Sequence, residues 1–112
     1  MLYQFKQQAR DFIVEEVLPE LPTGKGEVLY IFFEKENLTT MEVVEFIGQE
    51  FSLSREEIGI AGLKDKAGIT RQWITFYKSV IDRVGGELAF LDILSQKVKI
   101  LKSTWGEHFL RV

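Results

Sequence analysis

An apolar run at residues 28–33 constrains the fold of this chain most strongly. It reads Val-Leu-Tyr-Ile-Phe-Phe and lies between Glu27 and Glu34. A short, nearly continuous apolar run favours a strand that is buried on both faces. We therefore predict a strand over residues 27–34, in the interior of a packed domain.

A helix is expected soon after this strand. Residues 39–42 read Thr-Thr-Met-Glu, a capping-box pattern in which a hydroxyl and a carboxylate bond the backbone N–H groups at a helix start. Apolar residues then recur at helical spacing, at Val43, Val44, Phe46, Ile47 and Phe51. The pattern predicts a helix over residues 40–51 whose apolar stripe packs into the core.

The other expected elements are shorter. Gly85-Gly86 would interrupt a helix, so the apolar residues around this pair predict only a short helix near residues 87–93. A second capping-box pattern covers residues 54–57. Apolar and β-branched stretches predict strands over residues 11–17, 58–61, 72–77 and 97–100, and the beginning of another over residues 108–112. Together these elements indicate an α+β fold, with a small mixed or antiparallel sheet packed against one long helix.

Composition limits the classes of protein that this chain can belong to. With 112 residues, 46% of them hydrophobic, it can bury one core, so we expect a single domain over residues 1–112. Cysteine is absent and His108 is the only histidine, which excludes a disulfide framework and a Cys/His zinc site. Lys6 and Arg10 interrupt the apolar residues near the start, and no apolar run approaches the length of a membrane span. We expect a soluble, cytoplasmic protein that does not enter a membrane.

The net charge of −3 hides an asymmetry between the two halves. Residues 1–57 hold 5 Lys and Arg against 12 Asp and Glu, a balance of −7, whereas residues 58–112 hold 9 against 5, a balance of +4. The basic half could attract the phosphates of a nucleic acid, and the acidic half should then face elsewhere. The alternative is that both sets of charges are ordinary solvated faces.

The turn over residues 61–68 carries the densest chemistry. It reads Ala-Gly-Leu-Lys-Asp-Lys-Ala-Gly, and its small residues let another backbone or a ligand approach closely. Lys64 and Lys66 favour the ionised form of Asp65, which a carboxylate nucleophile needs at neutral pH. By composition alone, a turn of this kind is more often a solvated loop. The turn lies between the strands expected over residues 58–61 and 72–77, and this rigid scaffold would hold the carboxylate in place, as catalysis requires.

Three blocks of the sequence resemble the TruD family of tRNA pseudouridine synthases. The first covers residues 5–16, with Lys6 and Asp11-Phe12 at the family spacing. The second, Gly24-Lys25-Gly26-Glu27, is similar to the family's Gly-x-Gly-Glu turn. The third matches the family's Ala-Gly-x-Lys-Asp-Lys/Arg turn and the following Thr-x-Gln-Trp, at Ala61, Gly62, Lys64, Asp65, Lys66, Thr70, Gln72 and Trp73. Three blocks in the family's order are more specific than one motif.

The resemblance implies the N-terminal half of a pseudouridine-synthase catalytic domain, in an enzyme that isomerises uridine to pseudouridine in tRNA. It makes Asp65 the catalytic nucleophile and Lys6 its basic partner, within ion-pair distance. It gives substrate-binding roles to Phe12, Lys64, Lys66, Thr70, Gln72 and Phe109, with the two phenylalanines beside a base that is turned out of the RNA stack. It implies RNA, specifically tRNA, as the partner, and neither a cofactor nor a metal.

The sequence also departs from the family pattern. The family's Gly-Asn-x-Phe motif is here Gly106-Glu107-His108-Phe109, and the charge of Glu107 would repel both Asp65 and RNA if it pointed inward. Val28 stands where the family usually has histidine. Family members are much longer, so the resemblance covers only their first part, without the inserted domain and the second half of the catalytic domain.

These departures leave alternatives open. The chain is expected to be either a fragment of a longer enzyme or a naturally short relative. In both cases the strand expected over residues 108–112 lacks a neighbour, which favours self-association or a complementing chain at the unpaired sheet edge. A non-catalytic module that binds RNA or a protein is the main alternative function, and a plain structural domain is another.

Overall fold

The computed structural model describes residues 13–62 and 68–111, and it confirms the α+β fold class. These residues form four strands and three α-helices, with one short 3₁₀ helix between α1 and β3. In chain order these elements are β1 (Ile13–Glu15), β2 (Val28–Glu36), α1 (Thr40–Phe51), the 3₁₀ helix η2 (Arg55–Glu57), β3 (Ile69–Tyr77), α2 (Lys78–Arg83), α3 (Glu87–Leu94) and β4 (Lys99–Gly106).

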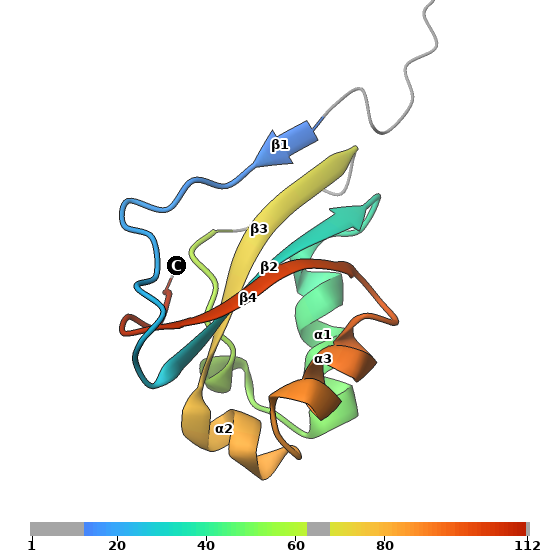
Figure 1. The fold of residues 1–112 in the computed structure, drawn as a ribbon. Coiled ribbons are helices and arrows are strands. Elements are labelled where there is room, and N and C mark those ends of the chain that lie inside the picture. Colours follow the sequence, from blue (N-terminus) through green and yellow to red (C-terminus); the bar gives the residue numbers. More distant parts are fainter. Residues whose placement is uncertain (1–12, 63–67, 112) are drawn as a thin grey trace, which may run out of the picture.

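The strands form one mixed sheet in the order β1-β3-β2-β4 (Figure 1). β1 runs parallel to β3, whereas β2 is antiparallel to both β3 and β4. The apolar run that begins at Val28 therefore lies in an interior strand, as predicted, and the strand continues to Glu36. A mixed sheet was one of the two sheet types that the sequence favoured.

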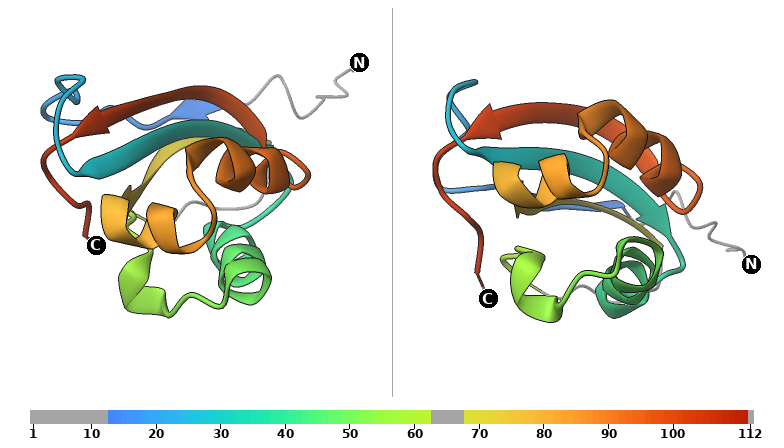
Figure 2. Two further views of the ribbon diagram at one scale, coloured as in Figure 1. Left: turned by 60° about the horizontal axis from the view of Figure 1, so that its bottom comes forward. Right: turned by 90° about the horizontal axis from the view of Figure 1, so that it is seen from below.

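The main core lies between the sheet and its helices. Leu29, Ile31 and Phe33 of β2 are fully buried, as are Ile74 and Phe76 of β3. They pack with residues of all three helices, which gather on the same side of the sheet (Figure 2). One long helix was expected to pack against the sheet, whereas α1, α2 and α3 together cover this face.

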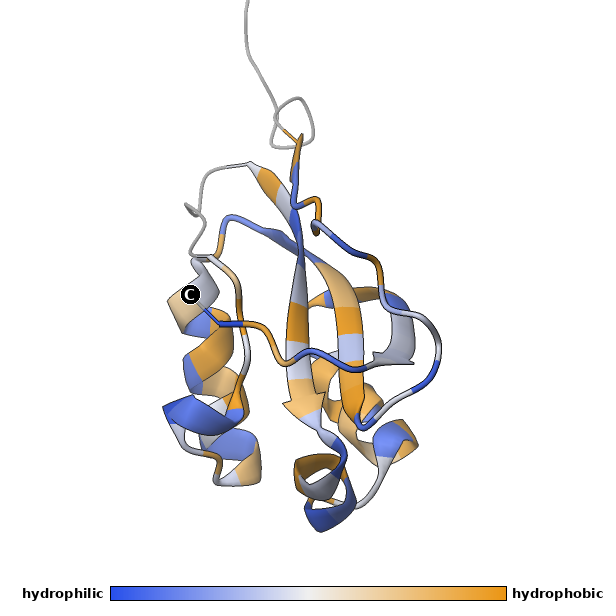
Figure 3. Cartoon of the chain, turned by 90° about the vertical axis from the view of Figure 1, so that its left-hand side faces the viewer, coloured by the Kyte–Doolittle hydropathy of each residue, from blue (hydrophilic) through white to orange (hydrophobic). Residues whose placement is uncertain are grey.

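A second, smaller core occupies the opposite face of the sheet. Tyr30 and Trp73 meet there with their ring centroids 6.0 Å apart, and Leu18 packs beside them. The segment that follows β1 and the C-terminal segment run along this side of the molecule (Figure 1). Orange apolar residues alternate with paler polar ones along the strands, which is the pattern expected when the two faces of a sheet pack differently (Figure 3).

Helix α1 begins as the sequence predicts. The Thr39 hydroxyl accepts a hydrogen bond from the Glu42 N–H at 3.0 Å, and the Glu42 carboxylate accepts one from the Thr39 N–H at 2.7 Å. The helix ends at Phe51 and is capped by Ser52, whose φ of 55° is left-handed. Its bounds, Thr40–Phe51, confirm the predicted range, and Val43, Val44 and Ile47 are buried as expected.

Helix α2 was not predicted as a separate element. Gly85 and Gly86 both have positive φ angles, of 110° and 98°, so they end one helix and allow another to start in a new direction. The predicted short helix near residues 87–93 is α3, and the second capping box, formed by Ser54 and Glu57, starts η2. None of the helices in the described part of the chain is long and apolar enough to cross a membrane.

Four predicted strands differ in the structure. The strand predicted over residues 11–17 ends at Glu15, and the one predicted over residues 97–100 begins at Lys99 and continues to Gly106. The other two, over residues 58–61 and 108–112, do not form regular strands in the described residues. Residues 58–61 make only a single bridge, in which Gly59 and Thr75 exchange backbone hydrogen bonds of 2.9 and 2.8 Å. The two segments approach so closely there that a Cβ on Gly59 would clash with the Thr75 hydroxyl.

The strand predicted to begin at residues 108–112 is wrong for its described part. The Tyr30 hydroxyl donates to the His108 carbonyl at 2.5 Å, and the Leu110 N–H donates to the Thr75 hydroxyl at 3.1 Å. These side-chain partners replace a ladder, so the segment adds no strand to the sheet. The edges of the described sheet are β1 and β4, and the unpaired edge expected at His108 is not there.

Candidate functional site

Two of the sequence blocks meet at one end of the sheet. β1 and β3 both begin there, with Ile13 and Ile69 as Cα partners in the parallel pair (Figure 1). The predicted site residues Lys6, Phe12, Lys64, Asp65 and Lys66 lie outside the described residues. Phe12 directly precedes β1, and Asp65 lies four positions before Ile69 in the sequence. The described scaffold therefore brings the attachment points of both blocks to the same place.

The short strand β1 is fixed to β3 by more than its ladder. The Glu16 N–H donates to the Arg71 carbonyl at 2.8 Å, and the Glu16 carboxylate accepts from the Trp73 N–H at 2.8 Å. This carboxylate thus continues the hydrogen bonding of the two strands past Glu15, where β1 ends. A three-residue strand gains a further point of attachment in this way.

A row of charged residues crosses the same end of the sheet. The Arg71 guanidinium contacts Glu34 of β2 at 2.9 Å and Glu15 of β1 at 3.4 Å, and Lys99 of β4 is the register partner of Glu34. The hydrogen bond to Glu34, followed by that to Glu15, raises the pKa of Arg71 above its usual value. Because Arg71 is 34% exposed, these ion pairs orient the strands more than they stabilise the fold.

Asn37 binds Gly68, the last residue of the stretch 61–68 that the sequence predicts as a turn. Its N–H donates to the Gly68 carbonyl at 3.1 Å, and its side-chain Oδ1 accepts from the Gly68 N–H at 3.2 Å. Asn37 has a left-handed φ of 56° and lies in the connection between β2 and α1. No sequence motif pointed to this residue, because the contact joins two loops that are far apart in the chain.

Thr70 and Gln72 lie inside the fold. They are 2% and 1% exposed, on the side of β3 that faces the helices. The Gln72 side-chain oxygen accepts a hydrogen bond from the Thr40 hydroxyl at 3.0 Å, which links β3 to the first turn of α1. Gln72 thus attaches β3 to α1, whereas Thr70 is simply buried on the same side. The predicted contact of both side chains with a substrate stays a prediction.

Phe109 lies at the other end of β3. Its ring is stacked on Tyr77, the last residue of the strand, with centroids 4.5 Å apart and an interplanar angle of 1°. Eight residue steps separate Tyr77 from Ile69, which corresponds to about 26 Å of strand. The predicted place of Phe109 beside the base therefore stays untested, and its ring is occupied by Tyr77 in this structure.

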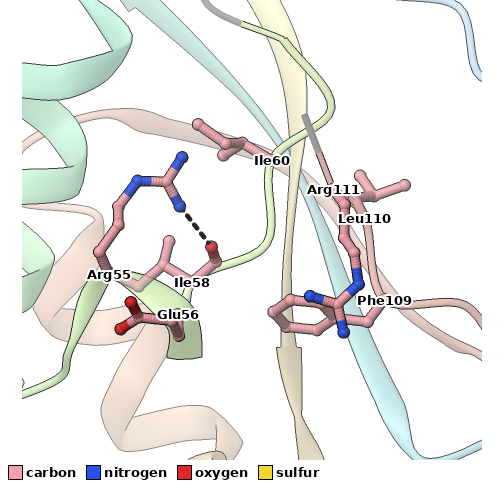
Figure 4. A pocket seen from close by; sticks show the side chains of 7 residues that line it. All are labelled: Arg55, Glu56, Ile58, Ile60, Phe109, Leu110 and Arg111. Atoms are coloured by element: carbon pink, nitrogen blue, oxygen red, sulfur yellow. Dashed lines mark hydrogen bonds between the residues drawn. The ribbon is translucent and has the colours of Figure 1, made fainter.

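A cavity of about 190 Å³ opens between the segment after α1 and the C-terminal segment (Figure 4). The Arg111 guanidinium lies over the Phe109 ring, 5.2 Å from its centroid, and Arg55 donates to the Ile58 carbonyl at 3.1 Å (Figure 4). The wall of the cavity is completed by Glu56, Ile60 and Leu110. Neither arginine was singled out from the sequence, because each stands alone in its segment.

The basic half of the chain is partly neutralised. Lys78 pairs with Asp82 at 2.8 Å, chiefly through a hydrogen bond that raises the pKa of Lys78, and Arg83 pairs with Glu57 at 2.6 Å. Lys99 and Lys102 on β4 make no salt bridge within residues 13–62 and 68–111. Both lysines are exposed, on the side of the sheet that carries no helix, so they are described cations that could attract phosphate.

Glu107, which replaces the family asparagine, is exposed at the end of β4. It lines a cavity together with Tyr30 and His108, on the face of the sheet that carries no helix. Asp65 lies outside the described residues, so the expected repulsion between it and Glu107 stays a prediction.

Comparisons with known proteins agree with the resemblance seen in the sequence. Similar proteins named tRNA pseudouridine synthase D come from Thermus thermophilus, 47% identical over 108 residues, and from Sulfurimonas denitrificans, 36% identical over 110 residues. The matches cover 96% and 98% of this chain but only 29% of each relative. The chain thus spans less than a third of the length of these relatives.

The fold has a counterpart among solved structures. A crystal structure from Methanosarcina mazei, described as a putative tRNA pseudouridine synthase D, superposes with a TM-score of 0.67 at 22% identity. It matches 95% of this chain and 23% of the solved chain. The sequence model of the family described as tRNA pseudouridine synthase D matches residues 3–111. This chain belongs to the TruD family of tRNA pseudouridine synthases.

Proposed function

We propose that this chain takes part in the isomerisation of uridine to pseudouridine in tRNA and supplies its catalytic aspartate, Asp65. The observation that carries the proposal is the pairing of Ile13 with Ile69 in a member of the TruD family. It joins the strand that follows Lys6 and Phe12 to the strand that follows Asp65. A catalytic site built from two distant sequence blocks needs a contact of this kind to bring the blocks together.

The reaction requires few groups from the protein. The bond between the ribose and N1 of uracil breaks, the base turns, and a bond from the ribose to C5 forms, while a proton leaves C5 and another joins N1. In our proposal Asp65 acts as the carboxylate nucleophile, and Lys6 favours its ionised form by pairing with it. Phe12 offers the base a stacking surface, an interaction worth about 1–3 kcal/mol.

The remaining predicted site residues have different parts in this proposal. Lys64 and Lys66 flank Asp65 and attract the RNA backbone. Thr70 and Gln72 act through the position of β3, because both are buried against the helix side. Phe109 contacts substrate only if its stack on Tyr77 opens.

A non-catalytic module that binds RNA is the second candidate. The observation that favours it is coverage, because the chain spans 29% of the relatives that it resembles. A part of a site can retain RNA affinity without holding a turned-out nucleotide firmly enough to react. Both candidate functions predict that the chain binds tRNA, but only the first predicts that pseudouridine is formed.

The test compares two proteins. One is the 112-residue chain itself, and the other is the Thermus thermophilus relative with its matching 108-residue segment replaced by this chain. Both are incubated with unmodified tRNA, and pseudouridine is detected by base-specific chemical labelling and primer extension. If the proposal is correct, the Thermus thermophilus protein that carries this chain forms pseudouridine at the same tRNA position as the unaltered relative. Binding of tRNA without pseudouridine from either protein would contradict the proposal and favour the module.

A further inference from the structure

We propose that Asn37 is a positioning residue for Asp65, because it fixes Gly68, three residues after Asp65 in the chain. This inference rests on the proposed function. The residue belongs to none of the three sequence blocks, and its contact with Gly68 joins two separate connections of the fold. Its role would be to limit where the carboxylate can lie, not to touch the substrate.

The contact takes over where the β2–β3 ladder ends. Glu36 and Ile69 are the last register partners, so the next pair along the two strands would be Asn37 and Gly68. The left-handed backbone of Asn37, with φ of 56°, turns the chain away toward α1. Its side-chain Oδ1 then receives the Gly68 N–H, while its own N–H still reaches the Gly68 carbonyl. Gly68 is therefore held on both its donor and its acceptor.

Asparagine suits this position for two reasons. It tolerates the left-handed conformation better than most residues with a side chain, and its amide supplies a neutral acceptor. Glycine would adopt the same backbone but would leave the buried Gly68 N–H without that acceptor. Aspartate would keep an acceptor and add a negative charge near the turn.

The two residues that follow Asn37 are also held in place. Toward β2, the buried Lys35 donates from Nζ to the Leu38 carbonyl at 2.6 Å. Toward α1, the Thr39 N–H is bound by the carboxylate of the capping box. The connection of residues 37–39 is thus anchored to a strand and to a helix, and it can serve as a fixed point.

A fixed point at Gly68 matters because only Lys66 and Ala67 separate it from Asp65. A short tether of this kind restricts the space open to the carboxylate, and misplacement by about 1 Å can cost an enzyme about 100-fold in rate. The inference assigns this restriction to the Asn37 side chain.

Three variants test it. Asn37→Gly removes the acceptor and keeps the backbone conformation, and Asn37→Asp keeps an acceptor. Ser52→Gly is the matched control, because Ser52 is also a left-handed residue with a side chain, with φ of 55°, and it caps α1. It corrects for the extra flexibility that glycine gives the unfolded chain.

The first measurement is amide hydrogen exchange at Gly68 by NMR in the 112-residue chain, which needs no activity. We expect exchange about fivefold faster in Asn37→Gly, the effect of one hydrogen bond, and near the original rate in Asn37→Asp and Ser52→Gly. Unchanged exchange in Asn37→Gly would overturn the inference.

The second measurement is the rate of pseudouridine formation in the Thermus thermophilus protein that carries this chain. Asn37→Gly should lower kcat about tenfold with KM nearly constant, because misplacement of the nucleophile slows chemistry more than binding. Faster exchange at Gly68 with an unchanged kcat would also overturn the positioning role. Turnover that survives Asp65→Asn would instead overturn the proposed function, so the two failures can be told apart.

Discussion

Ile13 and Ile69 are Cα partners in a parallel strand pair, although one lies near the start of the chain and the other in its second half. The pair joins the first and the third of the three sequence blocks that carry the family resemblance. A parallel pair needs a long connection between its strands, and here that connection contains β2, α1 and η2. The candidate site is therefore assembled from distant parts of the chain and depends on the sheet as a whole.

Removal of the Glu16 carboxylate should weaken the attachment of β1 to β3. Glu16→Ala leaves the Trp73 N–H without its acceptor, and we expect a loss of about 1–2 kcal/mol in the free energy of unfolding. Glu16→Gln retains a side-chain oxygen and should lose less. Urea denaturation of both variants checks this, with Glu20→Ala as an exposed control on the following segment. Equal stability of Glu16→Ala and the control would contradict the attachment.

The buried contact between Thr40 and Gln72 should behave as a coupled pair. Thr40→Val removes the hydroxyl that donates to the Gln72 oxygen, and it should cost about 1–3 kcal/mol of stability because the oxygen stays buried. The double variant Thr40→Val/Gln72→Leu should lose less than the sum of the two single losses. Strictly additive losses in urea denaturation would mean that the two side chains act independently.

The stability of the η2 region should depend on acid pH through Glu57. A hydrogen bond from the Ser54 backbone, followed by one from Arg83, lowers the pKa of Glu57 below its usual value. The carboxylate thus contributes stability that is complete above the unfolded-state pKa of about 4.3 and declines as the pH falls through the folded-state value.

Unfolding free energies measured from about pH 6 to about pH 3 test this dependence. Glu57→Gln should flatten the loss of stability below about pH 4.3, because the titrating group is gone. Arg83→Gln should give an intermediate slope, since it removes only one of the partners of Glu57. Identical slopes for the original protein and Glu57→Gln would be the contrary result.

The lysines of β4 should contribute to RNA affinity. Lys99 and Lys102 are exposed on the side of the sheet that carries no helix, as the register partners of Glu34 and Phe32. Replacement of either by alanine should weaken tRNA binding and reduce the slope of log affinity against log salt by about 1. Lys78→Ala is the control, because Lys78 already pairs with Asp82. An equal effect of the control would refute the assignment of this face.

The local signals in the sequence were sufficient for several elements. The capping box at Thr39 and the apolar run from Val28 predicted α1 and β2 because helix starts and buried strands depend on nearby residues. Gly85-Gly86 signalled an interruption, but not that a helix would stand on each side of it.

Long-range contacts could not be predicted in this way. Asn37 accepts a hydrogen bond from Gly68, and Phe109 stacks on Tyr77. Each contact joins two segments that are far apart in the chain and come together only in the folded protein. The same holds for the segment after Gly106, where hydrogen bonds to Tyr30 and Thr75 replaced the expected strand. The family resemblance supplied Lys6 and Asp65 as partners, which no periodicity indicates.

The most direct test of the central claim is the formation of pseudouridine in tRNA by Asp65→Asn, in the Thermus thermophilus protein that carries this chain. The amide keeps the shape of the side chain but cannot act as a carboxylate nucleophile. Asp82→Asn serves as the control, because Asp82 is an exposed residue of α2 paired with Lys78. We predict no pseudouridine from Asp65→Asn with nearly unchanged tRNA affinity, and full activity from Asp82→Asn. Pseudouridine formation by Asp65→Asn at the rate of the control would contradict the assignment of Asp65 as the catalytic residue.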